Sequence, residues 1–345
     1  MNLNYKKLFT SSILLLVIYS CSRIPNKPND SKPSETPSPI TSNQPSQPNL
    51  GNPNPINSIE EIYSPILYFD SQEKQPITSV EAYLQMGISL EGKKRIGSYK
   101  VLKQNISEND LATNINPKVK IENDDYELMI QTKDQVSKYD EKVYTRKIIK
   151  DNFTYLQYWF FYSYNDIKGT GGISLIHKCG NHQADWEHIS IKVNNSAFQN
   201  AKNDSDYLKA IDGIYFSQHN KGQHDDRKFK KFGDKGLSFE RSHIKAFPAR
   251  GTHATYFEPH TDKGYLLVSL LGMKLYDKAD GKGTTFKTQG HLINLENSNW
   301  SKFGGRWGKI SDDICNIAEW FSSASNDGPI GPMQQNSGID WDKDK

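Results

Sequence analysis

From residue 141 onward, short segments in which apolar and polar residues alternate recur along the chain, and a period of two is typical of β-strands. They are rich in aromatic and β-branched residues and are separated by Gly, Asn and Asp. The segments are EKVYTRKIIK, FTYLQYWFFYSY, HISIKV, GIYFSQH, HIKAFPA and GYLLVSLLGMKLY. Only SVEAYLQMGISL indicates a helix, with Val80, Tyr83, Leu84 and Ile88 near one face. The pattern predicts a mainly β fold, an antiparallel two-sheet β-sandwich with few short helices.

The start of the chain has a different pattern. Lys6 and Lys7 precede the apolar run LFTSSILLLVIYS, which is shorter than the about 20 residues of a membrane-spanning helix but suits a secretion signal. The run ends at Cys21 and resembles a bacterial lipoprotein signal, in which cleavage before a cysteine exposes the residue that is lipidated. We therefore expect residues 1–20 to be a signal peptide and Cys21 to carry the lipid. The resemblance implies an anchored protein of the bacterial cell envelope, at the outer membrane or cell surface.

The segment after Cys21 cannot form a core. Residues 22–57 contain 9 of the 16 prolines of the chain and no aromatic residue. Such a composition is typical of an extended, disordered tether, here reaching at most ~110 Å. We expect residues 58–345 to fold as a single domain, a length within the range of all-β sandwiches.

Charge and cysteine content narrow the function classes. The net charge is +3, with lysines and acids interspersed, so no basic stripe indicates a nucleic-acid partner. We expect a monomer. Cys179 and Cys315 are the remaining cysteines; a disulfide between them is allowed in an exported protein, and the sequence leaves this pairing open. No Cys/His spacing indicates a thiolate zinc site, and no GxSxG motif indicates a serine nucleophile.

The stretch GNHQADWEHISIKV departs from the strand pattern. Ile189, Ile191 and Val193 lie two apart on one apolar face, and the same alternation puts Asp185 and Glu187 on that face. A buried carboxylate must be paired, hydrogen-bonded or bound to a metal. The two carboxylates could converge on one cation, or they could form salt bridges at the end of a strand.

Three further residues of this stretch belong to the candidate site. His182, just upstream, can add a nitrogen ligand to the carboxylates. Trp186 and His188 fall on the opposite face, where we expect an exposed indole to offer a platform for a sugar or headgroup. Other ligand-binding candidates lie at strand ends and turns. They are Gln218 and His219 in YFSQHN, and Arg250 and His253 in PARGTHATY.

Taken together in chain order, these motifs resemble the vacuolar protein sorting-associated protein 62 family. The resemblance rests on SPILYFDSQEKQPITSVEAYL, LQYWFFYSYND, GNHQADWEHISIKV, YFSQHN, ARGTHATY, GRWG and GPIGP. The family has no established enzymatic activity to transfer, so the resemblance supports a binding protein more than an enzyme.

The central motif is also similar to the Gly-His-Arg-His-Asp-Trp-Glu heptapeptide of the necrosis-inducing toxins. This similarity implies a divalent cation held by His182, Asp185 and Glu187, with an upstream aspartate near Asp166, beside a glycolipid-headgroup site. Ala184 replaces the second histidine and Asn181 the glycine, which puts toxin activity in doubt more than cation binding. Oxygen-rich ligands favour calcium, magnesium or manganese over zinc.

The sequence thus favours a lipid-anchored β-sandwich that binds a divalent cation and a glycan or lipid headgroup. The alternative is a metal-dependent hydrolase of a glycan or phosphoester, which would use His188 or His253 as its base.

Overall fold

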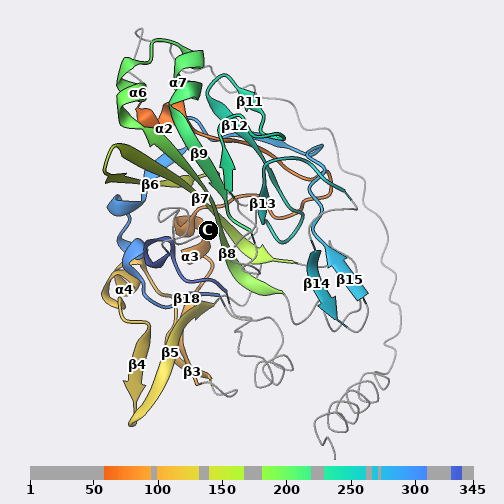
Figure 1. The fold of residues 1–345 in the computed structure, drawn as a ribbon. Coiled ribbons are helices and arrows are strands. Elements are labelled where there is room, and N and C mark those ends of the chain that lie inside the picture. Colours follow the sequence, from red (N-terminus) through yellow and green to blue (C-terminus); the bar gives the residue numbers. More distant parts are fainter. Residues whose placement is uncertain are drawn as a thin grey trace, which may run out of the picture. The chain divides into compact units, whose positions relative to one another are not determined.

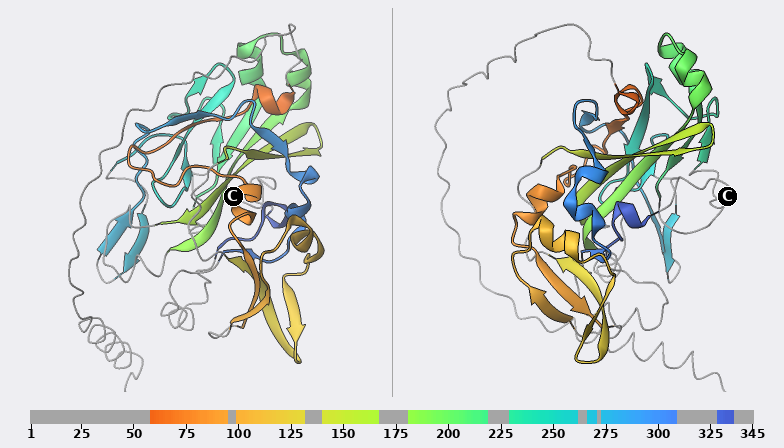
Figure 2. Two further views of the ribbon diagram at one scale, coloured as in Figure 1. Left: turned by 180° about the vertical axis from the view of Figure 1, so that it is seen from behind. Right: turned by 90° about the vertical axis from the view of Figure 1, so that its left-hand side faces the viewer.

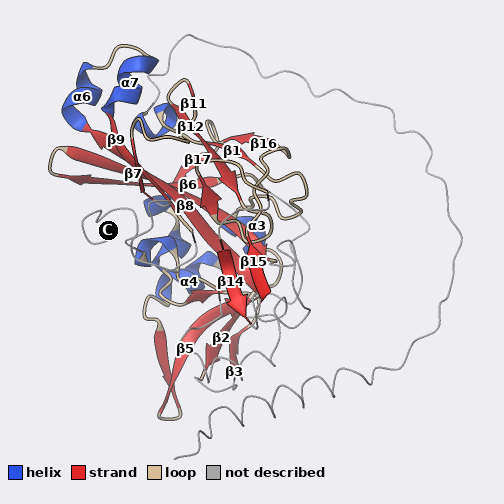
Figure 3. Ribbon diagram, turned by 45° about the vertical axis from the view of Figure 1, so that its right-hand side comes forward, coloured by secondary structure: helices blue, strands red, loops and turns tan. Residues whose placement is uncertain are grey.

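The predicted strands are present in the computed structural model, which describes residues 58–94, 99–131, 140–166, 181–218, 229–261, 266–270, 273–308 and 328–335. Contacts divide the chain into two units, Met1–Pro53 and Asn54–Lys345, and every described residue belongs to the second. Strands predominate and the helices are short, so the predicted mainly β class is confirmed (Figure 3).

The largest sheet has six strands in the order β10-β9-β8-β7-β6-β17. They are β10 (Phe229–Lys231), β9 (Ile211–Phe216), β8 (His182–Asn194), β7 (Phe153–Asn165), β6 (Val143–Lys150) and β17 (Leu292–Asn294). The long strands β7 and β8 run side by side through its middle (Figure 1). A two-residue turn at Asp151 and Asn152 joins β6 to β7, and Asp151 has a φ of 54°. All pairs in this sheet are antiparallel except β17 with β6.

A second sheet has five strands, with β1 between β12 and β16. They are β1 (Ile66–Tyr68), β11 (Phe239–Glu240), β12 (His243–Pro248), β13 (Thr255–Tyr256) and β16 (Thr285–Lys287). β1 pairs with β12 in parallel and with β16 antiparallel. Both sheets are therefore mainly antiparallel, and each contains one parallel pair.

The remaining strands form two smaller groups. A third sheet contains β2 (Ser89–Lys93), β3 (Tyr99–Lys103), β4 (Lys118–Ile121), β5 (Asp124–Gln131) and β18 (Arg306–Trp307). A two-stranded sheet contains β14 (Leu266–Leu270) and β15 (Met273–Tyr276), where the sequence pattern suggested one continuous strand.

The helices are α2 (Ile59–Ile62), α3 (Val80–Leu84), α4 (Glu108–Thr113), α6 (Asn195–Asn200) and α7 (Asp204–Ala210), with 3-10 helices η2 (Leu295–Asn297), η3 (Asn299–Lys302) and η4 (Pro332–Gln334). The predicted helix corresponds to α3, whose N-cap Ser79 accepts a hydrogen bond from the Ala82 amide at 3.0 Å. It is shorter than predicted, because Gly87 takes a φ of 75° and the chain then enters β2. No helix among the described residues is long and apolar enough to cross a membrane.

Apolar residues cover both faces of the six-stranded sheet. On one face Leu156, Tyr158 and Phe160 of β7 share a core cluster with Leu67 of β1 and Ile244 of β12. The opposite face belongs to a second cluster with residues of α3, η3, β2 and β5. Helices α3 and α4, in orange, lie together with the blue 3-10 helices η2 and η3 beside the central strands (Figure 2). The six-stranded sheet is thus covered on both faces, whereas the sequence predicted two sheets packed on each other through one face each.

Candidate functional site

The predicted placement of the two carboxylates on β8 is confirmed by the register of the strands. Tyr162 of β7 lies opposite Asp185, and Phe160 lies opposite Glu187. Asp185 and Glu187 therefore share a face with Ile189, toward the first core cluster. Their exposed fractions are 7% and 9%, so both carboxylates are buried and need partners.

The partner of Asp185 is a histidine from a distant turn. Oδ2 of Asp185 lies 3.1 Å from Nδ1 of His253, and Oδ1 accepts a hydrogen bond from the Trp186 amide at 3.0 Å. His253 is fully buried, and its ring stacks on Tyr162 with centroids 3.8 Å apart. Its Nε2 has no hydrogen-bond partner among the described residues. Asp185 thus orients the imidazole and leaves its second nitrogen available to a ligand.

The turn between β12 and β13 brings His253 to Asp185. The His253 amide donates to the Ala249 carbonyl at 2.9 Å, and the Ala249 amide donates to the Ala254 carbonyl at 2.9 Å. Gly251 has a φ of 73°, and a Cβ there would lie 2.0 Å from the Asp166 carbonyl oxygen. Glycine is required at this position because the turn approaches the end of β7 so closely.

Two acids, the half-buried Glu73 and the buried Asp277, hold the turn in place. The Gly251 amide donates to Oε2 of Glu73 at 2.7 Å. Asp277 is fully buried and accepts hydrogen bonds from the Thr252 hydroxyl at 2.7 Å and the Tyr256 hydroxyl at 2.6 Å. These contacts lie on either side of His253, so they fix the position of its imidazole.

Glu187 is bound to the neighbouring strand. The Ser217 hydroxyl donates to Oε2 of Glu187, and the same hydroxyl oxygen accepts a hydrogen bond from the His188 amide at 2.7 Å. Ser217 follows directly after β9 and its amide donates to the His188 carbonyl at 3.0 Å. The Glu187 carboxylate is therefore held at a fixed position.

Tyr162 lies where the negative charges gather. Burial raises the pKa of its hydroxyl well above the ordinary value, and the charges of Glu73, Glu187 and Asp185 raise it further. The hydroxyl has no hydrogen-bond partner among the described residues. The cluster formed by Glu73, Tyr162, Asp185, Glu187 and His253, here called the β7–β8 site, thus combines negative charge with two unsatisfied polar atoms.

The other predicted metal ligands have different partners. Nδ1 of His182 lies 2.9 Å from the Ala184 carbonyl of its own strand, and Oδ1 of Asp166 accepts a hydrogen bond from the Asn181 side chain at 3.0 Å. Within the described part of the chain, no group of three or more His, Cys, Asp or Glu side chains has the arrangement of a metal site. Cation binding by His182, Asp185, Glu187 and Asp166 stays a prediction.

The predicted exposure of Trp186 is wrong. Its exposed fraction is 4%, and its indole packs on Trp300 and Phe161 in the second core cluster. His188, also expected on the polar face, is 1% exposed and stacks on Trp159 with centroids 4.0 Å apart. The reason is the layer that covers this face of the sheet, so neither side chain is a surface platform for a sugar.

Of the remaining predicted site residues, two have hydrogen-bond partners among the described residues and four lie outside them. Nη1 of Arg250 donates to Oε1 of Gln72, next to Glu73, and Gln218 donates to the Thr255 carbonyl at 3.4 Å. His219, Cys21, Cys179 and Cys315 lie outside the described residues.

Sequence reasoning missed Glu73, Tyr162 and Asp277. Glu73 lies in a polar loop inside the first segment of the family resemblance, where the pattern of apolar residues does not single it out, and Asp277 follows β15 with no motif around it. Tyr162 is one of several tyrosines in β7, and only the strand register shows that it lies opposite Asp185. Its position two residues beyond Phe160 on the same face is the one signal that the alternating pattern contained.

Comparison with known proteins identifies the family. A family model described as vacuolar protein sorting-associated protein 62 matches residues 21–267, so the chain belongs to this family, as its motifs suggested. No curated protein matches the chain.

Several solved structures are similar to the chain at low sequence identity. One is NLPPya in complex with mannosamine, with 13% identity, 71% of this chain and 78% of that chain covered, and a TM-score of 0.32. Another is Necrosis and Ethylene inducing Protein 2 from the causal agent of cocoa's Witches Broom disease. Its identity is 13%, the match covers 78% of this chain and 91% of that chain, and the TM-score is 0.32. A third, described as a toxin fold for microbial attack and plant defense, has 12% identity, coverage of 85% and 93%, and a TM-score of 0.34. Scores of this size support no argument from those proteins to the function of this chain.

Proposed function

We propose that the domain is a binding module that holds a divalent cation beside Asp185 and Glu187 and binds a glycan or lipid headgroup there. The observation that carries this proposal is the pair of buried polar atoms without partners, Nε2 of His253 and Oη of Tyr162, next to three carboxylates. Buried polar atoms are normally satisfied, so their presence beside concentrated negative charge supports a ligand site.

The chemistry of the available donors fits a hard cation. Glu73, Asp185 and Glu187 offer carboxylate oxygens, the ligands that calcium, magnesium and manganese prefer. Asp185 and Glu187 are the residues we propose as ligands, with His182 and Asp166 as further candidates. A bound cation would offset the negative charge and attract phosphate or hydroxyl groups of a ligand.

Calorimetric titration of the full-length chain with calcium, magnesium and manganese tests cation binding. We expect saturable heat with at least one ion, and its loss in Asp185→Asn and in Glu187→Gln. Asp212→Asn is the matched control, because Asp212 pairs with Lys192 at 2.7 Å on β8, outside the β7–β8 site. No response to any ion, or an unchanged response in Asp185→Asn, would contradict the proposal.

A metal-dependent hydrolase acting on a glycan or phosphoester is the second candidate function. It is favoured by the 3.1 Å contact between Asp185 and His253, because a carboxylate that orients an imidazole is the usual arrangement around a general base. In that case Nε2 of His253 would accept a proton from water. Chromogenic substrates and a glycan and lipid array separate the two functions. Turnover that is lost in His253→Gln while cation affinity is kept favours the hydrolase, and array binding without turnover favours the module.

We further propose that the domain is anchored through a lipid on Cys21 in the bacterial cell envelope. The signal-like run before Cys21 and the proline-rich segment after it support this proposal. Metabolic labelling with a fatty acid should mark the protein, and Cys21→Ala should abolish the label and release the domain into the soluble fraction. An unlabelled native chain would contradict it.

A further inference from the structure

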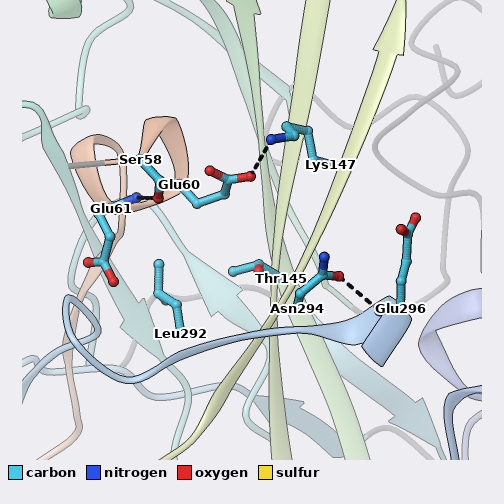
Figure 4. A pocket seen from close by; sticks show the side chains of 8 residues that line it. All are labelled: Ser58, Glu60, Glu61, Thr145, Lys147, Leu292, Asn294 and Glu296. Atoms are coloured by element: carbon cyan, nitrogen blue, oxygen red, sulfur yellow. Dashed lines mark hydrogen bonds and ion pairs between the residues drawn. The ribbon is translucent and has the colours of Figure 1, made fainter. Parts of the chain in front are cut away.

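A polar pocket lies away from the β7–β8 site. It has a volume of about 330 Å³ and is formed by α2, β6, β17 and η2 (Figure 4). Thr145 of β6 lines the pocket and lies opposite Tyr158 of β7. Strand β7 separates β6 from β8, and Tyr158 is four residues before Tyr162. The pocket shares no residue with the β7–β8 site. Its size is in the range of about 300–1,000 Å³ found for small-molecule sites.

One ion pair inside the pocket is already formed. Nζ of Lys147 lies 2.9 Å from Oε1 of Glu60. Burial is the largest single influence on the Glu60 carboxyl and acts to raise its pKa. The hydrogen bond and the charge of Lys147, together with hydrogen bonds from the Glu60 amide and Ser58, outweigh it, so the pKa lies below its ordinary value. Glu60 is therefore ionised and balanced by Lys147 at neutral pH.

Two further carboxylates line the pocket. Glu61, in α2, accepts a hydrogen bond from the Gly290 amide at 3.1 Å. Glu296, in η2, lies on the other side of the pocket, where its main chain is fixed by a hydrogen bond from its amide to Asn294 at 2.9 Å (Figure 4). The charge of Glu296 also acts on Arg146, but the two form no ion pair. With three carboxylates and one ammonium group, the lining has a formal charge of −2.

The pocket also has an apolar wall. Leu292 of β17 lies between the two sides that carry Glu61 and Glu296 (Figure 4). A ligand that fits this arrangement has positive charge at both ends and an apolar middle. Ammonium groups donate only, which matches the carboxylate acceptors, and a methylene chain can lie along Leu292.

We propose that this pocket binds a small organic cation with two or more amino groups, of the diamine or polyamine class. Its ammonium groups contact Glu61 and Glu296, and its methylene chain packs on Leu292. The Glu60–Lys147 pair closes one side of the pocket and excludes a third cationic group.

Calorimetric titration of the full-length chain with spermidine and putrescine tests the proposal. We expect saturable binding that weakens as salt rises from about 0.02 to 0.15 M. Glu61→Gln and Glu296→Gln should each weaken binding about three- to tenfold. Lys147→Met should strengthen it by a similar factor, because Glu60 becomes available to the ligand. Asp212→Asn removes the same charge elsewhere and should leave the affinity unchanged.

Two results would overturn the proposal. One is the absence of saturable binding by either amine to the folded native chain. The other is a Glu61→Gln/Glu296→Gln double variant that binds as tightly as the native chain, since this shows that the amine binds elsewhere. Thermal melting of each variant shows that it is folded. Asp185→Asn should bind spermidine normally, so failure at the β7–β8 site and failure at this pocket are distinguishable.

Discussion

The two halves of β8 are buried to nearly the same extent and differ in what they bury. Ile189, Ile191 and Val193 are fully buried against the first core cluster, while Asp185 and Glu187 are 7% and 9% exposed on the same face. The apolar half is satisfied by packing. The acidic half needs His253 and Ser217 from two other segments. On this face, the acidic half therefore replaces apolar packing with polar contacts to other segments.

The largest expected effect tests whether the acidic half of β8 belongs to the core as fully as the apolar half. Trp186→Ala should lower the free energy of unfolding by about 3–5 kcal/mol, because the indole packs on Trp300 and Phe161. Ile191→Ala, in the apolar half, should cost about 2–5 kcal/mol. Urea denaturation measures both. A cost below about 0.5 kcal/mol for Trp186→Ala would mean that the indole is a surface side chain.

The next effect concerns the turn that supports the acidic half. Gly251→Ala should lower the free energy of unfolding by about 2–4 kcal/mol, because the new Cβ would lie 2.0 Å from the Asp166 carbonyl oxygen. Gly290→Ala is the matched control: its φ is 81° but no atom lies within 4 Å of the new Cβ, so the cost should be about 1 kcal/mol. Equal costs for the two variants would mean that the turn does not pack closely on β7.

Alkaline pH should destabilise the fold through a tyrosine opposite each half of β8. Tyr158 lies opposite Ile189 and Tyr162 opposite Asp185, and burial raises the pKa of both hydroxyls well above the ordinary value. Both stay protonated in the folded chain while the unfolded chain ionises, so stability is complete below pH about 10 and is lost as the pH rises further. Each tyrosine contributes up to about 1.4 kcal/mol per pH unit. Urea denaturation from pH 8 to 11 should show a shallower loss in Tyr158→Phe and in Tyr162→Phe; unchanged slopes would contradict this.

The smallest expected effect is the difference in stability cost between Tyr158→Phe and Tyr162→Phe at neutral pH. The Tyr158 hydroxyl donates to the Glu60 carbonyl at 2.9 Å, so Tyr158→Phe should cost about 1 kcal/mol. The Tyr162 hydroxyl has no partner among the described residues, so Tyr162→Phe should change stability by less than about 0.5 kcal/mol. Thermal melting resolves the two outcomes. A larger cost for Tyr162→Phe would show that its hydroxyl has a partner in the folded protein.

The sequence predicts the features that depend on residues close together in the chain, such as the face of a strand on which a side chain lies. The period of two places Asp185 and Glu187 on the face of Ile189, and the strand register confirms this. It could not show that His253 meets Asp185, because the two residues are 68 positions apart.

Nor could the sequence show that Trp186 is buried, since Ser190 and Lys192 made its face look polar. Ser190 is in fact fully buried, and Lys192 lies over the Phe153 ring while pairing with Asp212. Polar residues on one face of a strand therefore do not prove that this face is exposed to solvent.

The position of β1 in the second sheet affects how the chain folds. Ile66 pairs with Lys245 on one side and with Lys287 on the other, so β1 has no local partner within that sheet. Contacts between such distant segments slow folding, because a long loop must close before they form. During synthesis β1 emerges early and remains unpaired until β12 and β16 follow. The second sheet can therefore assemble only late, and a chain cut short before residue 285 would leave one edge of β1 open to pairing with other chains.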